Sequence, residues 1–414
     1  MDNLILKMEK NFWVLSFAIF FFANCSQPQK QTGAEDDGIP TIVIMANISN
    51  AQKVTLSTVA SSIDYCMLET ERNCVLEPGR QIFGSGDCFV AMNSGMSSNY
   101  CYVFDRKTGN FVREISQIGQ GPNDYQFPVK VLSGEKGQIC LLGGNQYLFF
   151  NLDGTLSHKM NNPYLNHFNI TAYEDLYVGY VSNRSGNSTI RLAFIDKTGE
   201  LIDSIPNHRF VEVDGRRGRP LETDFSFHPF NNNLYYKDIY CDTLYHIKEF
   251  TLQPRYIFNT GGRAVPYKLQ SEGRVDVREA VAGREWDRYA KYIVINTILE
   301  DVNFLYFTFD YKRMMYPAIY HKSEDKTQIL MPESLPQHPS YRISSPYGFE
   351  NDLDGGLPFW PAQMISEKEM MCVYTAEELL GLDVSKITDP KLKKVLNSID
   401  EESNPVVAIV TLKE

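Results

Sequence analysis

The residues of this sequence that could bind a ligand lie in short stretches rich in glycine and proline. The first stretch, residues 118–125, contains the pattern Gly119-x-Gly121-Pro122. A phosphate-binding loop of this kind needs a helix after it, whose N-terminus faces the anion, but a β-forming segment follows here. The stretch is therefore either a tight turn in which glycine supplies positive φ, or a loop whose polar side chains face a ligand. The candidate ligand-binding residues of this loop are Gln120, Asn123 and Tyr125.

Two further stretches offer other kinds of contact. Residues 214–220 place three arginines on an otherwise acidic protein, and Arg217 at their centre could bind a carboxylate, sulfate or phosphate. Trp360, in the stretch 355–361, could stack on a sugar or peptide ring. The alternatives are a solvated loop for the arginines and core packing for the tryptophan. We hypothesise that Tyr125, Arg217 and Trp360 converge on one pocket.

Enzyme motifs are missing from the sequence. It contains no GxSxG elbow, no HExxH pair and no P-loop, and its seven histidines are scattered. His228 and His246 are the best candidates for an enzyme site of the lyase or hydrolase type. We predict no catalytic residue, no metal ligand and no cofactor.

The N-terminus has the pattern of a secretion signal. Lys7 and Lys10 precede a continuous apolar stretch, residues 12–23, which is too short to span a bilayer and suits a signal peptide. Small residues then precede Cys25, as in the lipobox of bacterial lipoproteins. We predict a signal peptide over residues 1–24, lipidation of Cys25 and a flexible tether over residues 25–40. An ordinary cleaved signal with an incidental cysteine is the alternative.

Composition and charge narrow the class of protein. The 414 residues are 43% hydrophobic, and 51 acidic against 40 basic residues give a net charge of −11. This charge argues against binding to nucleic acid. Beyond Cys25 there are seven cysteines and no CxxC pair. Buried thiols are expected for most of them, while Cys66–Cys74 or Cys88–Cys101 disulfides stay open.

A repeat organises the elements that must position these residues. Five predicted hairpins share a turn marked by an aspartate, and the markers are 48, 43, 46 and 83 residues apart. Three of these spacings match the ~40–50 residues of a four-stranded propeller blade. An Ig-type sandwich is the alternative, but it has no such repeat. The markers are Asp105, Asp153, Asp196, Asp242 and Asp325.

The long interval and the chain ends complete the predicted ring. The interval of 83 residues contains either a degenerate blade or, as we prefer, a helix inserted at residues 274–292 and followed by strands at 293–299 and 304–309. We expect the tail strand, residues 406–411, to close the ring against residues 41–45. Short helices are predicted in the last blade, over residues 375–380 and 391–399.

Three stretches resemble a known family of six-bladed β-propeller lipoproteins from Gram-negative gut bacteria. They are Ile118–Tyr125, Asn351–Pro361 and the tail Asn404–Lys413, and with the hairpins the resemblance covers residues 41–414. Family members often have glutamate at the position of Asp124. The resemblance implies an all-β, six-bladed propeller and lipidation. It implies no catalytic residues, since most members have no assigned function.

Together these observations predict a lipid-anchored propeller that acts as a binding or scaffold module. Its expected partner is a small molecule, a glycan or a protein, its only membrane contact is the lipid anchor, and it binds no nucleic acid. The expected location is the cell envelope, as an outer-membrane lipoprotein facing the periplasm or the surface. The alternative function is a propeller-type lyase or hydrolase that acts in the central channel.

Overall fold

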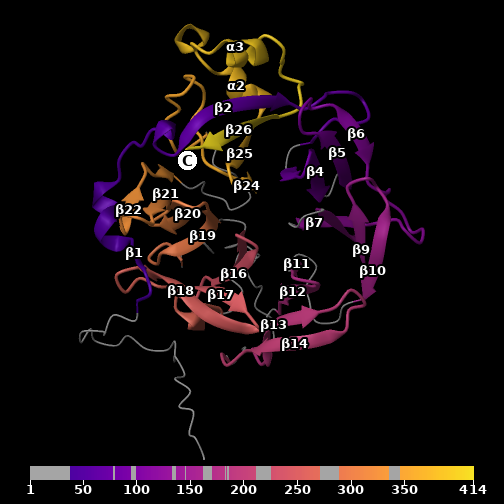
Figure 1. The fold of residues 1–414 in the computed structure, drawn as a ribbon, viewed down its shortest axis with the longest axis vertical. Coiled ribbons are helices and arrows are strands. Elements are labelled where there is room, and N and C mark those ends of the chain that lie inside the picture. Colours follow the sequence, from indigo (N-terminus) through magenta and orange to yellow (C-terminus); the bar gives the residue numbers. More distant parts are fainter. Residues whose placement is uncertain are drawn as a thin grey trace, which may run out of the picture. The chain divides into compact units, whose positions relative to one another are not determined.

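Six small, mainly antiparallel sheets are arranged in a ring, as the blades of a β-propeller (Figure 1). This computed structural model describes residues 38–77, 80–94, 99–132, 137–144, 146–161, 170–181, 183, 186–210, 225–270, 289–334 and 346–414. The chain divides into two units, Met1–Glu35 and Asp36–Glu414, and all described residues belong to the second. The predicted fold class is confirmed.

We number the blades from 1 to 6 in chain order. Each contains four strands that are neighbours in the sheet, and blades 4 and 5 carry one strand more. Blade 1 is β3 (Gln81–Ser85), β4 (Cys88–Ser94), β5 (Asn99–Asp105) and β6 (Phe111–Glu114); blade 2 is β7 (Phe127–Leu132), β8 (Gln138–Gly143), β9 (Gln146–Asn151) and β10 (Leu156–Asn161); blade 3 is β11 (Ile170–Tyr173), β12 (Leu176–Tyr180), β13 (Ile190–Ile195) and β14 (Leu201–Pro206). Blade 4 is β15 (Phe225–Phe230), β16 (Asn233–Asp238), β17 (Thr243–Lys248) and β18 (Thr251–Asn259) with β1 (Thr41–Val43); blade 5 is β19 (Val294–Glu300), β20 (Phe304–Tyr311), β21 (Met314–His321) and β22 (Lys326–Ile329) with β23 (Glu333–Ser334); blade 6 is β24 (Gln363–Ser366), β25 (Glu369–Tyr374), β26 (Val406–Leu412) and β2 (Ala60–Met67).

The central strands of a blade are apolar on both faces, because a neighbouring blade covers each face. Strand β9 shows this in four consecutive buried residues. Tyr147 and Phe149 pack in a cluster shared with blade 3, whereas Leu148 and Phe150 pack in a cluster shared with blade 1. Since successive side chains of a strand point to opposite faces, one strand holds both neighbours in place.

The aspartate markers of blades 1 to 3 occupy equivalent turns between the third and fourth strands. In each turn the aspartate Oδ1 accepts hydrogen bonds from the backbone N–H and the hydroxyl of a threonine two or three residues later, at 2.6–2.9 Å. This local pairing explains why Asp and Thr recur at these turns. The pairs are Asp105 with Thr108, Asp153 with Thr155, and Asp196 with Thr198.

The last two markers differ. Asp325 does lie in the equivalent turn of blade 5, with positive φ, and accepts a hydrogen bond from the hydroxyl of Tyr320 at 2.9 Å. Asp242 instead lies between the second and third strands of blade 4. The prediction that Asp242 marks the same turn as the other aspartates was wrong. In blade 4, the turn between the third and fourth strands is formed by Glu249 and Phe250.

The ring closes in blade 6, where strands from both ends of the chain meet. The tail strand β26 lies between β25 and β2, so that Val410 is opposite Ile63 on one side and Met370 on the other. The prediction that the tail pairs with residues 41–45 was wrong. Strand β2 carries polar residues such as Ser61 and Asp64 on its exposed face, which hid it in the sequence.

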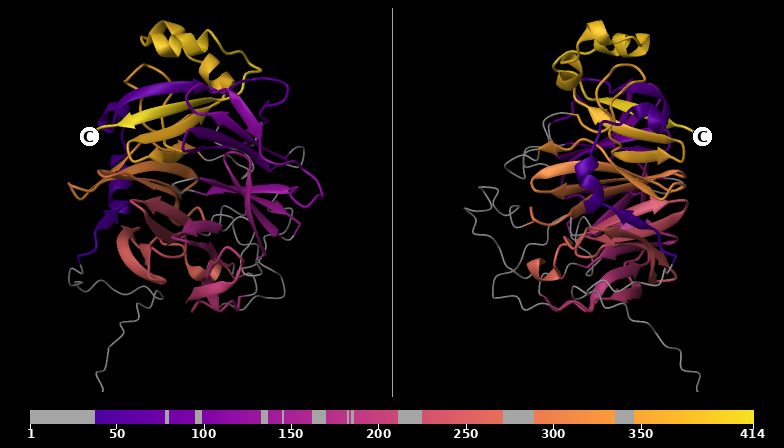
Figure 2. Two further views of the ribbon diagram at one scale, coloured as in Figure 1. Left: turned by 45° about the vertical axis from the view of Figure 1, so that its right-hand side comes forward. Right: turned by 90° about the vertical axis from the view of Figure 1, so that its left-hand side faces the viewer.

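The predicted closing strand has another role. Strand β1 pairs in parallel with β18 and becomes the outermost strand of blade 4. From there the chain passes the 3-10 helices η1 (Met45–Asn50) and η2 (Leu56–Thr58) before it enters β2. We call residues 41–59 the N-terminal strap. It crosses the edge of blade 5, where Gln52 N donates to Ile329 O at 3.1 Å (Figure 2, right).

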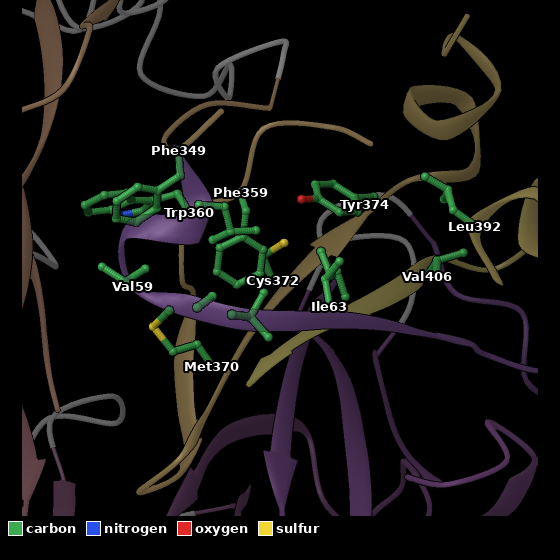
Figure 3. Close-up of a cluster of buried hydrophobic side chains, with 14 of the residues drawn as sticks. Val59, Ile63, Phe349, Phe359, Trp360, Met370, Cys372, Tyr374, Leu392 and Val406 are labelled. Carbon is green, nitrogen blue, oxygen red and sulfur yellow. The ribbon is translucent and has the colours of Figure 1, made fainter. Parts of the chain in front are cut away.

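Two short helices lie between β25 and β26, as predicted: α2 (Ala376–Leu380) and α3 (Pro390–Leu396). A capping box of Thr375 and Glu378 begins α2, and Asp389 caps α3. A further 3-10 helix, η5 (Val384–Lys386), lies between them. Their apolar residues join the cluster beneath blade 6, where Leu392 lies near Val406 (Figure 3).

The long interval between markers contains no additional sheet among the described residues. Residues 260–293 connect β18 to β19, and the two predicted strands are confirmed as β19 and β20. Most of the predicted helix at 274–292 lies outside the described residues, but η3 (Tyr267–Gln270) precedes it. In the described part of the chain, no helix has the length and apolar character needed to cross a membrane.

Candidate functional site

Long connections emerge at one face of the ring. In an antiparallel sheet, the connection from the second to the third strand and the connection to the next blade start from the same edge. These connections include residues 207–224, 260–293, 330–362 and 375–405, whereas turns at the opposite face are as short as residues 231–232. We call the face with the long connections the loop face. Variable, extended loops on a rigid scaffold are where binding sites usually form.

A polar cluster of the loop face surrounds Arg209, at the start of the connection from blade 3 to blade 4. Its backbone N–H donates to Asn207 Oδ1 at 3.1 Å. Its carbonyl oxygen accepts three hydrogen bonds, from Asn183 Nδ2 at 2.9 Å, Tyr267 Oη at 3.1 Å and Asn207 Nδ2 at 3.2 Å. These residues come from three different connections, so the cluster joins blades 3, 4 and 5 at one point.

The Arg209 side chain is held as firmly as its backbone. Nη1 lies 3.1 Å from Asp238 Oδ2, and Tyr240 N donates to the other oxygen of that carboxylate at 2.7 Å. The guanidinium carbon lies 5.0 Å from the centre of the Tyr267 ring, which meets Tyr240 edge to face. The buried amides of Asn183 and Asn207 hold this group in place, and its guanidinium and aromatic rings can recognise a carboxylate or a sugar ring.

Beneath this cluster lies a buried lysine. Lys237 Nζ donates to the carbonyl oxygens of Asp238, at 2.6 Å, and Cys241. Burial lowers the pKa of Lys237 and raises the pKa of the nearby Asp242 carboxyl, which accepts a hydrogen bond from Thr260. The lysine therefore fixes the backbone between β16 and β17 and so positions Asp238.

The Gly-Pro loop connects blades 1 and 2 as the turn interpretation predicts, but for a different physical reason. Neither Gly119 nor Gly121 is among the described glycines with positive φ. Instead, Asp124 Oδ2 accepts from Gly121 N at 2.7 Å, and a Cβ on Gly119 would lie 2.2 Å from that oxygen. The glycines leave space for a carboxylate that closes the loop, and the prediction of positive φ was wrong.

The candidate residues of this loop are split between surface and core. Gln120 and Asn123 are exposed on the loop face. Tyr125 is fully buried in the cluster between blades 1 and 2, and burial raises the pKa of its hydroxyl. Its ring packs between two blades, away from the surface of the loop face.

Trp360 is also a packing residue. It is 7% exposed and stacks on Phe349, with ring centres 5.5 Å apart, in the cluster beneath blade 6 (Figure 3). The turn before it is organised by Asp354, whose carboxylate accepts from Asn351 and Gly356 N at 2.7 and 2.8 Å. The structure thus does not bring Tyr125 and Trp360 together. Arg217 lies outside the described residues, as does Cys25.

The two histidine candidates pack against the same tyrosine ring, that of Tyr235, but have different hydrogen-bond partners. His246 in β17 lies 3.1 Å from Asn233 Oδ1. His228 in β15 is buried and lies 3.1 Å from Glu300 of blade 5. Sequence reasoning missed Glu300, although an acidic residue at the end of an apolar strand was a visible signal. It also missed Arg209, for which only its proximity to the arginine-rich stretch was a signal.

The described residues contain neither a disulfide nor a group of side chains suited to a metal ion. The seven cysteines of the described residues form no disulfide, so neither of the two pairings considered above is present: Cys66, Cys74, Cys88, Cys101, Cys140, Cys241 and Cys372. All but Cys88 are buried, as expected. Within the described ranges, no group of three or more histidine, cysteine, aspartate or glutamate side chains is placed to hold a metal ion.

Comparison with known proteins gives a family and a fold, but no activity. The family described as a domain of unknown function, DUF4934, matches residues 39–411. A Bacteroides fragilis protein, described provisionally as exported, is 17% identical and superposes with a TM-score of 0.65 over 91% of this chain and 100% of that chain. A DUF4221 family member from Bacteroides vulgatus is 13% identical, with a TM-score of 0.43 over 69% of this chain and 94% of that chain. No relative was found among curated proteins.

Proposed function

We propose that this chain, which belongs to the DUF4934 family, is a binding module whose loop face recognises a polar ligand at the Arg209 cluster. The observation that carries the proposal is the convergence of three connections on one arginine. Asn183, Asn207 and Tyr267 all donate to the Arg209 carbonyl oxygen. Groups held in this way lose little side-chain entropy on binding, which favours affinity.

The ligand class follows from the side chains of the cluster. Arg209 forms an ion pair with Asp238 and stacks against Tyr267, and Phe210 beside it is exposed. Guanidinium groups favour carboxylates, and aromatic rings favour the faces of sugars or peptide rings. We therefore propose a small carboxylate-bearing molecule or a glycan with acidic groups.

A ligand screen with matched variants tests this function. Purified protein without residues 1–37 is screened against acidic glycans and small carboxylates by thermal shift, and any hit is measured by calorimetry. Arg209→Lys keeps the charge but loses the planar fork, and Tyr267→Phe loses the hydroxyl. We expect each to weaken binding by about tenfold or more, a loss of ~1.4 kcal/mol. Lys197→Ala, in an exposed turn of the opposite face, is the matched control.

The outcomes separate clearly. Binding that is unchanged in both Arg209→Lys and Tyr267→Phe would place the ligand elsewhere and overturn the proposed site. Equal weakening in Lys197→Ala would indicate a non-specific charge effect. Circular dichroism checks that every variant is folded. The hydrogen bonds to the Arg209 carbonyl oxygen do not involve the Arg209 side chain, so Arg209→Lys should keep them.

We further propose that the module is tethered to the cell envelope by a lipid on Cys25. Cys25 follows the apolar stretch at the distance of a signal-peptide cleavage site. In cells that express the full chain, Cys25→Ser should move the protein from the membrane pellet to the soluble fraction. Unchanged pelleting of the variant would contradict the anchor.

A further inference from the structure

The contact between blades 4 and 5 contains a buried polar network around Glu300, the last residue of β19. The Glu300 side chain is 0% exposed. Its Oε2 accepts from Nε2 of His228, in β15, at 3.1 Å. Its Oε1 accepts from Nη2 of Arg255, in β18, at 2.5 Å and from Nζ of Lys322, in the turn after β21, at 2.7 Å. One carboxylate thus joins two strands of blade 4 to its own blade.

His228 is the member of this network whose protonation would destabilise the closed contact. Its side chain is 1% exposed, and Nδ1 is buried without a hydrogen-bond partner. Because Nε2 donates to Glu300, Nδ1 is the unprotonated nitrogen of a neutral ring. A proton at Nδ1 would create a buried N–H with no acceptor, which is costly in the protein interior.

The charges around His228 increase this cost. The ring faces Glu300 from β19, Arg255 from β18, Lys322 from blade 5 and the Tyr235 ring from β16. With neutral His228, one negative and two positive side chains already leave an excess positive charge. The Arg255 guanidinium is itself held 3.8 Å from the Tyr235 ring centre, so it cannot easily move away.

We propose that the contact between blades 4 and 5 is acid-sensitive: protonation of His228 at Nδ1 opens it, because only an open contact gives the new N–H a water acceptor and separates it from Arg255 and Lys322. The proton comes from solvent, and no covalent bond changes. The response is local to one of the six blade contacts and does not require the proposed ligand.

The electrostatics agree with the geometry. Burial lowers the pKa of His228 and outweighs the raising effect of Glu300, and the charges of Arg255 and Lys322 lower it further. Burial alone would raise the pKa of Glu300, but the hydrogen bond from His228 and the cations outweigh burial and lower it. The closed contact therefore keeps a neutral histidine beside an ionised glutamate.

Another blade contact supplies the matched control. His158 of blade 2 has partners on both ring nitrogens, Ser157 Oγ at Nδ1 and the Tyr177 hydroxyl at Nε2, each at 3.1 Å. A proton added to His158 therefore meets hydroxyl oxygens that can accept a hydrogen bond. The contact between blades 2 and 3 should stay closed in acid.

Hydrogen–deuterium exchange tests the proposal. Exchange of the full-length protein is compared at pH 7.5 and 5.5, each corrected for the intrinsic rate. We expect protection of β15 and β19 to fall by up to about tenfold at pH 5.5, with little change in β9 and β12. His228→Gln keeps an N–H for Glu300 and cannot gain charge, so it should abolish the response, whereas His158→Gln should leave it intact.

Two results would overturn the proposal. One is equal loss of protection in all blades at pH 5.5, and the other is a response of β15 and β19 that persists in His228→Gln. If His228→Gln fails to fold, NMR of ¹⁵N-labelled histidines in the wild-type protein decides. We expect one neutral histidine, protonated at Nε2, that stays neutral below pH 6 until exchange in β15 and β19 increases. Ordinary titration of every histidine near its usual pKa of ~6.5 would contradict the proposal.

Discussion

Blades 4 to 6 and blades 1 to 3 have the same strand order but differ at their outer edges. In blade 4 the strand β1 covers β18, and in blade 5 the N-terminal strap meets β22. In blade 6 the outermost strand is β2 itself, and α3 packs against it. In the described chain, the outer strands of blades 1 to 3, namely β6, β10 and β14, have no fifth strand.

The difference follows from where the ends of the chain lie. Blades 1 to 3 are each formed by a continuous segment, whereas blade 6 must bring β2 and β26 together from opposite ends. That long-range closure costs more chain entropy than a local hairpin. The strap and helices bury further apolar groups in this half, including Ile42, Ile44 and Leu56, and so offset the cost.

The largest effect should come from removing the closing strand. Deletion of residues 405–414 takes away the strand between β2 and β25 and the buried residues Val406, Val407 and Val410. We expect a loss of several kcal/mol of unfolding free energy, seen as aggregation or a strongly lowered Tm in calorimetry. Deletion of Glu414 alone is the control and should melt like the full chain. A wild-type Tm for the long deletion would show that the closure is not needed.

Matched isoleucines compare the two halves directly. Ile44 of the strap is fully buried, whereas Ile202 in the outer strand of blade 3 is 50% exposed. Ile44→Ala should cost ~2–5 kcal/mol and Ile202→Ala less than ~0.5 kcal/mol in urea unfolding. Similar losses at the two sites would contradict a stabilising role for the strap.

The aspartates of the two motif loops give a smaller contrast. Asp354 is buried and accepts from three donors, Asn351, Gly356 and Tyr65, the last of which lies on β2. Asp124 is half-buried and closes only its own loop. Asp354→Ala should therefore cost ~2–3 kcal/mol and Asp124→Ala about 1 kcal/mol. A reversed order in thermal unfolding would show that the connection to β2 adds nothing.

Aspartates in the two halves should change the unfolding free energy in opposite directions as the pH rises. Burial raises the pKa of Asp310 in blade 5 to about 6, so its folded state holds a proton more tightly than the unfolded chain. The stability that Asp310 contributes is present below pH ~4 and is lost as the pH rises through 6. Because Asn carries no charge at this buried position, Asp310→Asn should stabilise the protein at pH 7.5 by roughly 1–3 kcal/mol. The gain should disappear at pH 4.

The turn aspartates of blades 1 to 3 behave in the other direction. Hydrogen bonds from threonine lower the pKa of Asp105, Asp153 and Asp196, so their contribution is present above pH ~4 and lost in more acidic solution. Because these carboxylates are exposed, Asp153→Asn should have a small effect at pH 7.5 and none at pH 3. Unfolding curves of Asp310→Asn and Asp153→Asn between pH 3 and 8 test both signs. If the two substitutions changed the unfolding free energy with the same pH dependence, the opposite pKa shifts of Asp310 and Asp153 would be contradicted.

The repeat, the two short helices of blade 6 and the number of blades could be predicted from the sequence, because local turns, helix caps and apolar strands determine them. The partner of the tail could not, since β2 has polar residues on its exposed face and β1 has the more apolar sequence. The neighbouring Gly and Pro motivate the hypothesis that Tyr125 and Trp360 face a ligand, but both side chains are buried, and for Trp360 this is the packing alternative. Proximity to the arginine-rich stretch was the one signal for Arg209, because its partners come from connections far apart in the sequence.

Ligand binding at the Arg209 cluster of the loop face can be located by hydrogen–deuterium exchange of the protein with and without the best ligand from the screen. We expect ligand-dependent protection of segments 207–210, 239–242 and 260–270, which surround Arg209, Asp238 and Tyr267. Protection confined to the short turns of the opposite face, or to blades 1 and 2, would contradict it.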